Sequence, residues 1–225
     1  MNELLMLAEI VAIFSTVLIF KKFGGKYGLI AWVAVAVVMA NIQLVKSIDM
    51  FGLSATLGNV LFASVFMATD MLSENYGAKY SKKAVKMGIL AVLAFILVSQ
   101  ITLAYVPNTL DMANGAMQTL FTLTPRVMIA SIIMFAIANF ADVYLFEKLK
   151  KKFNGKKLWL RNNLCTILTN GLENFGLFFL AFGGVYEVKE LIIMACTTTI
   201  LEIIIAVCDT PFVYLSKKIH CKHED

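Results

Sequence analysis

The side chains of this chain that are best equipped for chemistry are carboxylates, amides and a guanidinium set within strongly apolar stretches. A charged residue at the centre of a bilayer costs roughly 2.5–3.5 kcal/mol on insertion scales, so each such residue is a candidate for function. Carboxylates accept N–H donors, and amides both donate and accept hydrogen bonds. These groups suit binding of a polar small molecule. The candidates are Asn41, Asp70, Glu74, Arg126, Asp142, Asn163, Asn170, Glu173 and Glu202.

Glu173 is the most prominent of these residues, because it lies in the middle of an apolar stretch. Asn163, Thr166, Asn170 and Glu173 recur at spacings of three and four, which places them on one face of a helix. This polar stripe is typical of a ligand-binding surface. The asparagines could instead act only as hydrogen-bonding contacts between helices.

The remaining charged candidates have simpler alternatives as well. Asp70, Glu74 and Asp142 could reach the cytoplasmic surface, and Arg126 could extend outward to the opposite surface. Glu202 could pair with a basic residue. The aromatic stretch 175–182 could pack against lipid or stack on a flat ligand.

The sequence contains no motif of a metalloprotease, a serine hydrolase or a P-loop ATPase. We therefore expect no enzymatic activity, no metal site and no cofactor. The two histidines, His220 and His223, flank Cys221 at the C-terminal end. That tract is interpreted as a polar tail, with adventitious metal binding as the alternative.

The elements that must position these residues are long and apolar. Hydrophobic residues make up 60% of the 225 residues, charged residues make up 16%, and the mean hydropathy is +0.79. A helix needs about 20 apolar residues to cross a bilayer. The sequence predicts an all-α polytopic membrane protein that forms a single transmembrane domain over 1–225. Its seven predicted spans are 4–20, 28–45, 54–72, 88–107, 125–146, 162–182 and 191–215.

Positive charge alternates with these spans. Of the 20 Lys and Arg residues, 17 fall into four clusters, at 21–26, 79–86, 148–161 and 217–222. Positive charge collects in cytoplasmic loops, so the pattern predicts an N-out, C-in orientation in the cell membrane. The same rule explains the basic run 148–157 better than nucleic-acid binding does. Residues 1–20 are interpreted as a retained helix, with a signal peptide as the alternative.

Three stretches carry a resemblance to a known family. They keep the family's order and spacing over about 40–183. The stretches are Ala40-Asn41-Ile42 with Lys46, Thr69-Asp70 through Glu74 to Tyr76-Gly77, and Pro125-Arg126 through Asp142 to Trp159-Leu160-Arg161-Asn162. In these features the chain resembles the queuosine-precursor transporters, also called the vitamin uptake transporter family. Cys165, Glu173 and Asn174 depart from residues common in that family.

The resemblance implies a multi-pass inner-membrane importer of a deazaguanine base or queuine for tRNA modification. It also implies a six-helix core, about 28–215, resembling the substrate-binding subunits of energy-coupling-factor transporters. A subunit of that kind, needing partner ATPases, is the alternative function, and a homodimer or a coupling partner stays open. For a purine-like base we expect Glu173, Asn170, Asn163, Asn41 and Arg126 to bind substrate. Gating or coupling is expected of Asp70, Glu74, Asp142 and Glu202.

Overall fold

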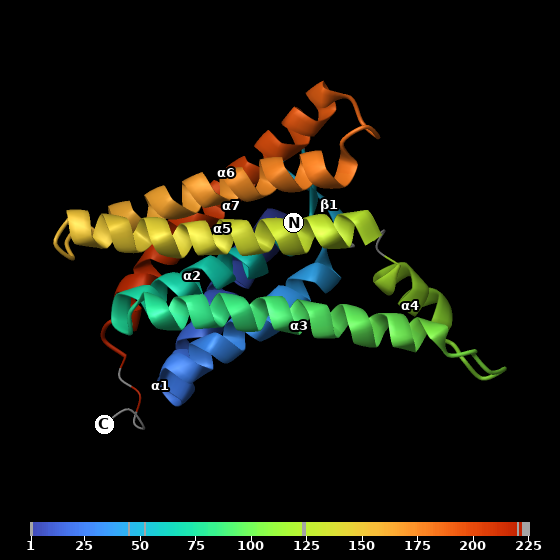
Figure 1. Ribbon diagram of the computed structural model, residues 1–225, viewed down its shortest axis with the longest axis horizontal. Coiled ribbons are helices and arrows are strands. Elements are labelled where there is room, and N and C mark those ends of the chain that lie inside the picture. The colour runs from blue at the N-terminus through green and yellow to red at the C-terminus, as the bar shows by residue number, and fades with distance from the viewer. Residues whose placement is uncertain (1, 45, 52, 123–124, 220, 222–225) are drawn as a thin grey trace.

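The chain forms a bundle of seven helices with one short β-hairpin in a computed structural model that describes residues 2–44, 46–51, 53–122, 125–219 and 221 (Figure 1). The predicted helical class is confirmed, but the antiparallel hairpin and a short helix in the predicted 108–124 loop were not expected. The elements are α1 (Asn2–Gln43), β1 (Ser47–Met50), β2 (Leu53–Thr56), α2 (Asn59–Asn75), α3 (Ala78–Ala104), α4 (Asn114–Phe121), α5 (Pro125–Lys152), α6 (Leu158–Phe182) and α7 (Val188–Ser216).

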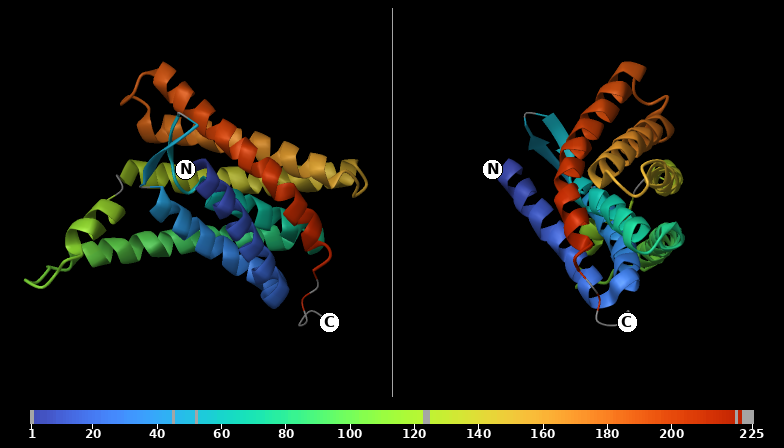
Figure 2. Two further views of the ribbon diagram at one scale, coloured as in Figure 1. Left: turned by 180° about the vertical axis from the view of Figure 1, so that it is seen from behind. Right: turned by 90° about the vertical axis from the view of Figure 1, so that its left-hand side faces the viewer.

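Helix α1 contains both of the first two predicted spans, and a sharp bend separates them. Gly25 leaves the helical conformation with φ 53° and ψ −134°, a region that glycine adopts without steric cost. A Cβ on Gly28 would lie 2.0 Å from the carbonyl oxygen of Phe20, so the second arm approaches the first too closely for any side chain there. The arms diverge from this bend, as the right-hand view of Figure 2 shows. The predicted loop at 21–27 is therefore a bent helix.

The four basic clusters gather at one end of the bundle, which we call the basic end. Lys21, beside the bend of α1, donates a hydrogen bond from Nζ to the carbonyl oxygen of Ser216 at the end of α7. The start of α3 lies there too, because the Ser73 and Ser81 hydroxyls are 2.8 Å apart. The connection between α5 and α6 completes this end, and α4 lies at the opposite end (Figure 1). Successive elements therefore alternate in direction, as a polytopic protein requires.

Five helices are long and apolar enough to cross a membrane: α1, α3, most of α5, α6 and α7. Helix α2 has only 17 residues, because the predicted third span begins with strand β2 and the helix itself starts at Asn59. It packs against α1, α3, α5 and α7, and its residues from Val60 to Ser73 are nearly all buried. Helix α2 is thus the central element around which the longer helices lie.

The distribution of polar and apolar side chains is the reverse of that in a water-soluble protein. Leu97 is 62% exposed and Ile129 is 59% exposed on the outside of the bundle, while Asp142, Arg161 and Asp209 are fully buried. Lipid solvates apolar surfaces, and ionisable groups within a membrane face the interior of a bundle. This packing supports a multi-pass membrane protein.

Candidate functional site

A cavity opens within the half of the bundle that lies away from the basic end. Its empty space is about 1090 Å³ when the open mouth is counted. Side chains from α1 to α7 line it, so the site exists only when the whole bundle is assembled. The polar lining residues are Asn41, Asn59, Ser99, Ser131, Glu173, Asn174, Thr198 and Glu202.

Two carboxylates are the charged groups of this cavity. Glu202, which is 8% exposed, accepts a hydrogen bond from Asn174 Nδ2 at 2.6 Å. Asn174 also reaches the hydroxyl of Thr199 at 3.2 Å. Glu173 is half-buried, and among the described residues it has no hydrogen-bond partner. Since no Lys or Arg occurs in the described lining, the cavity is suited to a ligand that donates hydrogen bonds.

Aromatic rings supply much of the remaining wall. The rings belong to Phe62, Phe95, Phe121, Phe135 and Phe178. Their flat apolar faces suit a planar ligand, as aromatic linings of small-molecule sites generally do.

Helix α4 covers one side of the cavity through Leu120 and Phe121. The Phe121 ring meets Phe95 of α3 edge to face, with ring centroids 5.8 Å apart. Gln100 Nε2 donates to the carbonyl oxygen of Phe121 at 3.2 Å. The short helix is thus held against α3 by a ring contact and a hydrogen bond, both at Phe121.

The structure brings together three of the residues predicted from sequence, Asn41, Glu173 and Glu202, in this cavity. Arg126 lies outside it and is exposed, where it donates to the carbonyl oxygens of Leu180 and Gly183 at 2.8 and 2.7 Å. It thereby ties the start of α5 to the end of α6.

Two further members of the predicted stripe lie away from the cavity lining. Asn163 donates to the hydroxyl of Thr210 at 2.7 Å and so joins α6 to α7. Asn170 is buried, and its Oδ1 receives no hydrogen bond from the described residues.

Sequence reasoning missed several lining residues, above all Asn59, Phe62 and Phe95. Nothing marks Phe62 and Phe95, because their neighbours in the sequence are equally apolar. Helix α4 was missed because the polar residues of the 108–124 segment predict a loop.

A second polar region lies deeper in the bundle, toward the basic end. Asp70, Asp142 and Asp209 are 1%, 0% and 0% exposed. Asn162 Nδ2 donates to Asp209 Oδ1 at 2.5 Å, and the hydroxyl of Thr169 lies 3.1 Å from Asp142 Oδ1. The alternative that Asp70 and Asp142 reach the surface is wrong, since other helices enclose both.

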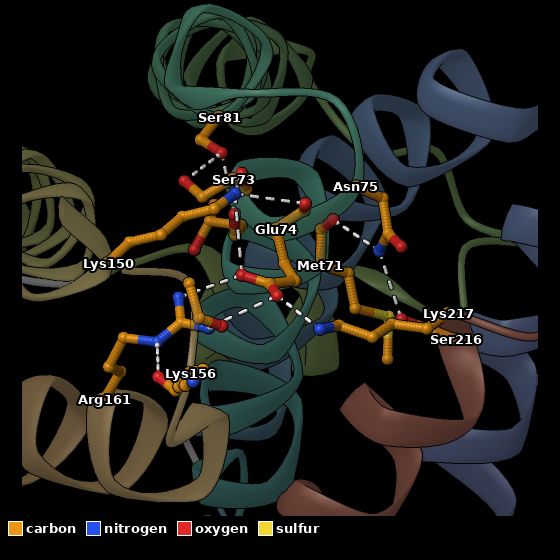
Figure 3. Close-up of polar contacts among 12 residues, drawn as sticks. Met71, Ser73, Glu74, Asn75, Ser81, Lys150, Lys156, Arg161, Ser216 and Lys217 are labelled. Atoms are coloured by element: carbon orange, nitrogen blue, oxygen red, sulfur yellow. Dashed lines mark hydrogen bonds and ion pairs between the residues drawn. The ribbon is translucent and has the colours of Figure 1, made fainter. Parts of the chain in front are cut away.

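Glu74 forms a third polar region at the basic end, shown in Figure 3. Arg161 Nη1 and Nη2 donate to its two carboxylate oxygens at 2.9 and 3.2 Å, Lys217 Nζ lies at 2.5 Å, and Lys150 Nζ at 3.5 Å. Its side chain is only 5% exposed, while its partners Lys150 and Lys217 are 27% and 40% exposed at the surface of this end. We call these four residues the Glu74 ion-pair cluster.

The cluster controls the charge of Glu74. Burial raises the pKa of this carboxyl, but hydrogen bonds from Arg161 and Lys217 outweigh burial and lower the pKa to about 2. Glu74 therefore stays ionised at physiological pH. It holds together the ends of α2, α5 and α7 and the start of α6.

Comparisons with known proteins place the chain in a family. The sequence profile of the family described as "Putative vitamin uptake transporter" matches residues 56–216. The chain belongs to this family.

The chain is also similar to two curated relatives. The chain is 35% identical over 206 residues, 91% of its own length and 90% of the relative's, to the "Probable queuosine precursor transporter" of Bacillus subtilis (strain 168). It is 20% identical over 166 residues, 70% of each chain, to the "Queuosine precursor transporter" of Escherichia coli (strain K12). No solved structure matches the chain significantly.

The described residues contain no group of three or more His, Cys, Asp or Glu arranged to hold a metal ion. Cys221 is buried, and its neighbours His220 and His223 lie outside the described residues.

Proposed function

We propose that this protein imports a queuosine precursor, a deazaguanine base or queuine, into the cytoplasm for tRNA modification. The observation that carries the proposal is a cavity lined by two carboxylates, amides and phenylalanines in a chain that belongs to a transporter family. The names of the two relatives specify the substrate class.

The chemistry of the cavity matches a guanine-like base. The amidine edge of such a base presents two adjacent N–H donors, and a carboxylate can accept both. In this proposal Glu173 accepts that edge, since its carboxylate has no partner among the described residues. Asn41 supplies a donor for the base carbonyl, and Phe178 or Phe135 stacks on the flat rings.

The predicted roles of the other residues divide by position. Glu202 joins the substrate site, while the Glu74 ion-pair cluster acts as the gate at the basic end. Asp70 and Asp142 act in coupling. Arg126, Asn163 and Asn170 support the site by positioning α5, α6 and α7 rather than by contacting substrate.

The proposed arrangement in the membrane has seven spans, with the N-terminus outside and the C-terminus in the cytoplasm of the inner membrane. The two arms of α1 and the short α2 count as three of the spans. This arrangement puts all four basic clusters on the cytoplasmic side, as the positive-inside rule requires. The cavity then lies nearer the outside, where substrate arrives.

The names of both relatives favour a chain that transports by itself over a binding subunit that needs partner ATPases. The test uses cells that cannot synthesise queuosine precursors, with and without this chain, and measures queuosine in tRNA. Each candidate base is supplied at low concentration. Restored modification in cells without coupling ATPases supports the proposal, and failure with every precursor despite membrane expression contradicts it.

A further inference from the structure

Asp70 and Asp142 are two buried acids that form no ion pair within 4 Å with any other described residue. Neither oxygen of Asp70 receives a hydrogen bond from another group among the described residues. Asp70 and Asp142 act on each other where α2 packs against α5. Two ionised carboxylates that interact in the interior of a bundle repel each other strongly, whereas a proton on one of them lets the two form a hydrogen bond.

The contacts of Asp142 also indicate that one of the two carboxyl groups carries a proton. The Thr169 hydroxyl, 3.1 Å from Asp142 Oδ1, also lies 2.9 Å from the carbonyl oxygen of Cys165. A hydroxyl has one hydrogen, and the backbone oxygen is the nearer acceptor. Asp142 Oδ2 has no donor among the described residues. A protonated Asp142 satisfies these contacts, because its O–H can donate to Thr169 or to Asp70.

The nearest cation is already engaged elsewhere. Arg161 acts on Asp70 from α6, but its Nε and Nη2 donate to the carbonyl oxygens of Lys156 and Gly155, and its Nη1 and Nη2 donate to Glu74. The other titratable groups facing the pair are Asp209 on α7 and Cys165 and Glu173 on α6.

Among the described residues, the side-chain hydrogen bonds that α1 and α3 donate to this part of α2 come from uncharged groups. The indole of Trp32 donates to Ser64, and the Ser81 hydroxyl donates to the carbonyl oxygen of Thr69. Neither helix therefore supplies a counter-ion for the pair through these contacts.

We propose that Asp70 and Asp142 share one proton, and that binding and release of this proton couple import to the proton gradient. This inference rests on the proposed transport function. A proton fits better than a metal ion, since the described acids form no metal-binding group. Asp70 lies one helical turn before Glu74 on α2, so release of the proton gives Arg161 a second anion. Competition for Arg161 then loosens the Glu74 ion-pair cluster and opens the basic end.

Infrared spectroscopy of the purified protein in lipid tests the shared proton without any substrate. At pH 7 we expect a C=O stretching band of protonated carboxyl in the wild-type protein. The intensity of this band should be lower in both Asp70→Asn and Asp142→Asn. Asp49→Asn, at an exposed hairpin position, is the matched control and leaves the band unchanged. Thr169→Val removes only the neighbouring hydroxyl and should shift the band, which serves if Asp142→Asn does not fold. Spectra identical to wild type in all three interior variants would overturn the pair.

Uptake of a labelled deazaguanine base into proteoliposomes tests the coupling. We expect an inward proton gradient to drive accumulation by the wild-type protein and at least a tenfold loss of that accumulation in Asp142→Asn. Asp49→Asn keeps it. Accumulation that follows a sodium gradient, or uptake that ignores pH, overturns coupling while the proposed function stands. The absence of wild-type uptake under every gradient contradicts the proposed function and with it the coupling.

Discussion

Glutamates occupy two regions of this bundle in opposite electrostatic settings. At the basic end Glu74 contacts Arg161, Lys150 and Lys217, and its pKa is lowered to about 2. In the cavity Glu173 and Glu202 meet no Lys or Arg among the described lining residues. A buried carboxylate with Lys and Arg partners therefore joins helices, while a carboxylate without such partners is available to a ligand.

Removing the centre of the ion-pair cluster should give the largest effect. Glu74→Ala leaves Arg161, which is fully buried, without its anion, and losing one partner of a buried pair costs roughly 3–5 kcal/mol. Chemical unfolding in detergent, followed by helical circular dichroism, measures the loss. Lys217 is 40% exposed, so Lys217→Ala should cost no more than about 1 kcal/mol. Equal losses in the two variants would contradict the assignment of Arg161 as the main partner.

Changing the cavity glutamate should leave stability intact and remove uptake. Glu173→Gln replaces an acceptor by an amide that donates toward the donors of the ligand. Uptake of the base should fall between about tenfold and about 100-fold, since a hydrogen bond to a charged group contributes roughly 1.5–3 kcal/mol. Glu190→Gln, exposed at the start of α7, is the matched control with unchanged uptake. Wild-type uptake by Glu173→Gln would remove this residue from the substrate site.

The pH dependence of unfolding should separate the two regions further. The pKa of Glu74 is about 2 in the folded protein and 4.5 when unperturbed, so the unfolded chain binds the proton first as pH falls. The stabilisation by Glu74 is complete above pH 4.5 and is lost as pH decreases through about 2. Unfolding measured across this range should show the loss for wild type. Glu74→Gln should remove this decrease in the free energy of unfolding. If the decrease at acid pH is the same in Glu74→Gln as in wild type, other carboxyl groups cause it.

The cover of the cavity should give the smallest effect. Phe121→Ala removes the edge-to-face contact with Phe95, which is worth roughly 0.5–1.5 kcal/mol for an aromatic pair. The apparent affinity for the base should change by about two- to tenfold, with unfolding little affected. Phe23→Ala, on an exposed ring at the bend of α1, provides the control. Identical transport by both variants would exclude α4 from the site.

Prediction from sequence succeeded where a property depends on a short segment. Glu173 could be identified as a candidate because a carboxylate inside an apolar stretch is unusual wherever that stretch packs. The hairpin at Ser47–Met50 and Leu53–Thr56 was missed, since the predicted third span begins at residue 54, within β2. The bend at Gly25 was predicted as a loop, because lysines and the Gly24-Gly25 pair are typical of one, but the helix continues through Lys21 and Lys22.

The partners of the polar residues could not be predicted in the same way. Glu74 and Arg161 are far apart in sequence, and only the tertiary structure brings the start of α6 to the end of α2. Arg126 was expected to meet substrate, but it contacts the carbonyl oxygens at the end of α6. Each of these outcomes depends on which helix faces which, and helix propensity carries no information about that.

The sequence by itself determined that this is a helical membrane protein whose basic loops share one side, because hydrophobic length and charge act segment by segment in a bilayer. The tertiary structure alone decided which polar groups meet. It brings Asn41, Glu173 and Glu202 to one cavity and buries both Asp70 and Asp142 inside the bundle. Burial inside the bundle is what gives these groups their chemistry, since a charge buried without a partner must find a proton or a ligand.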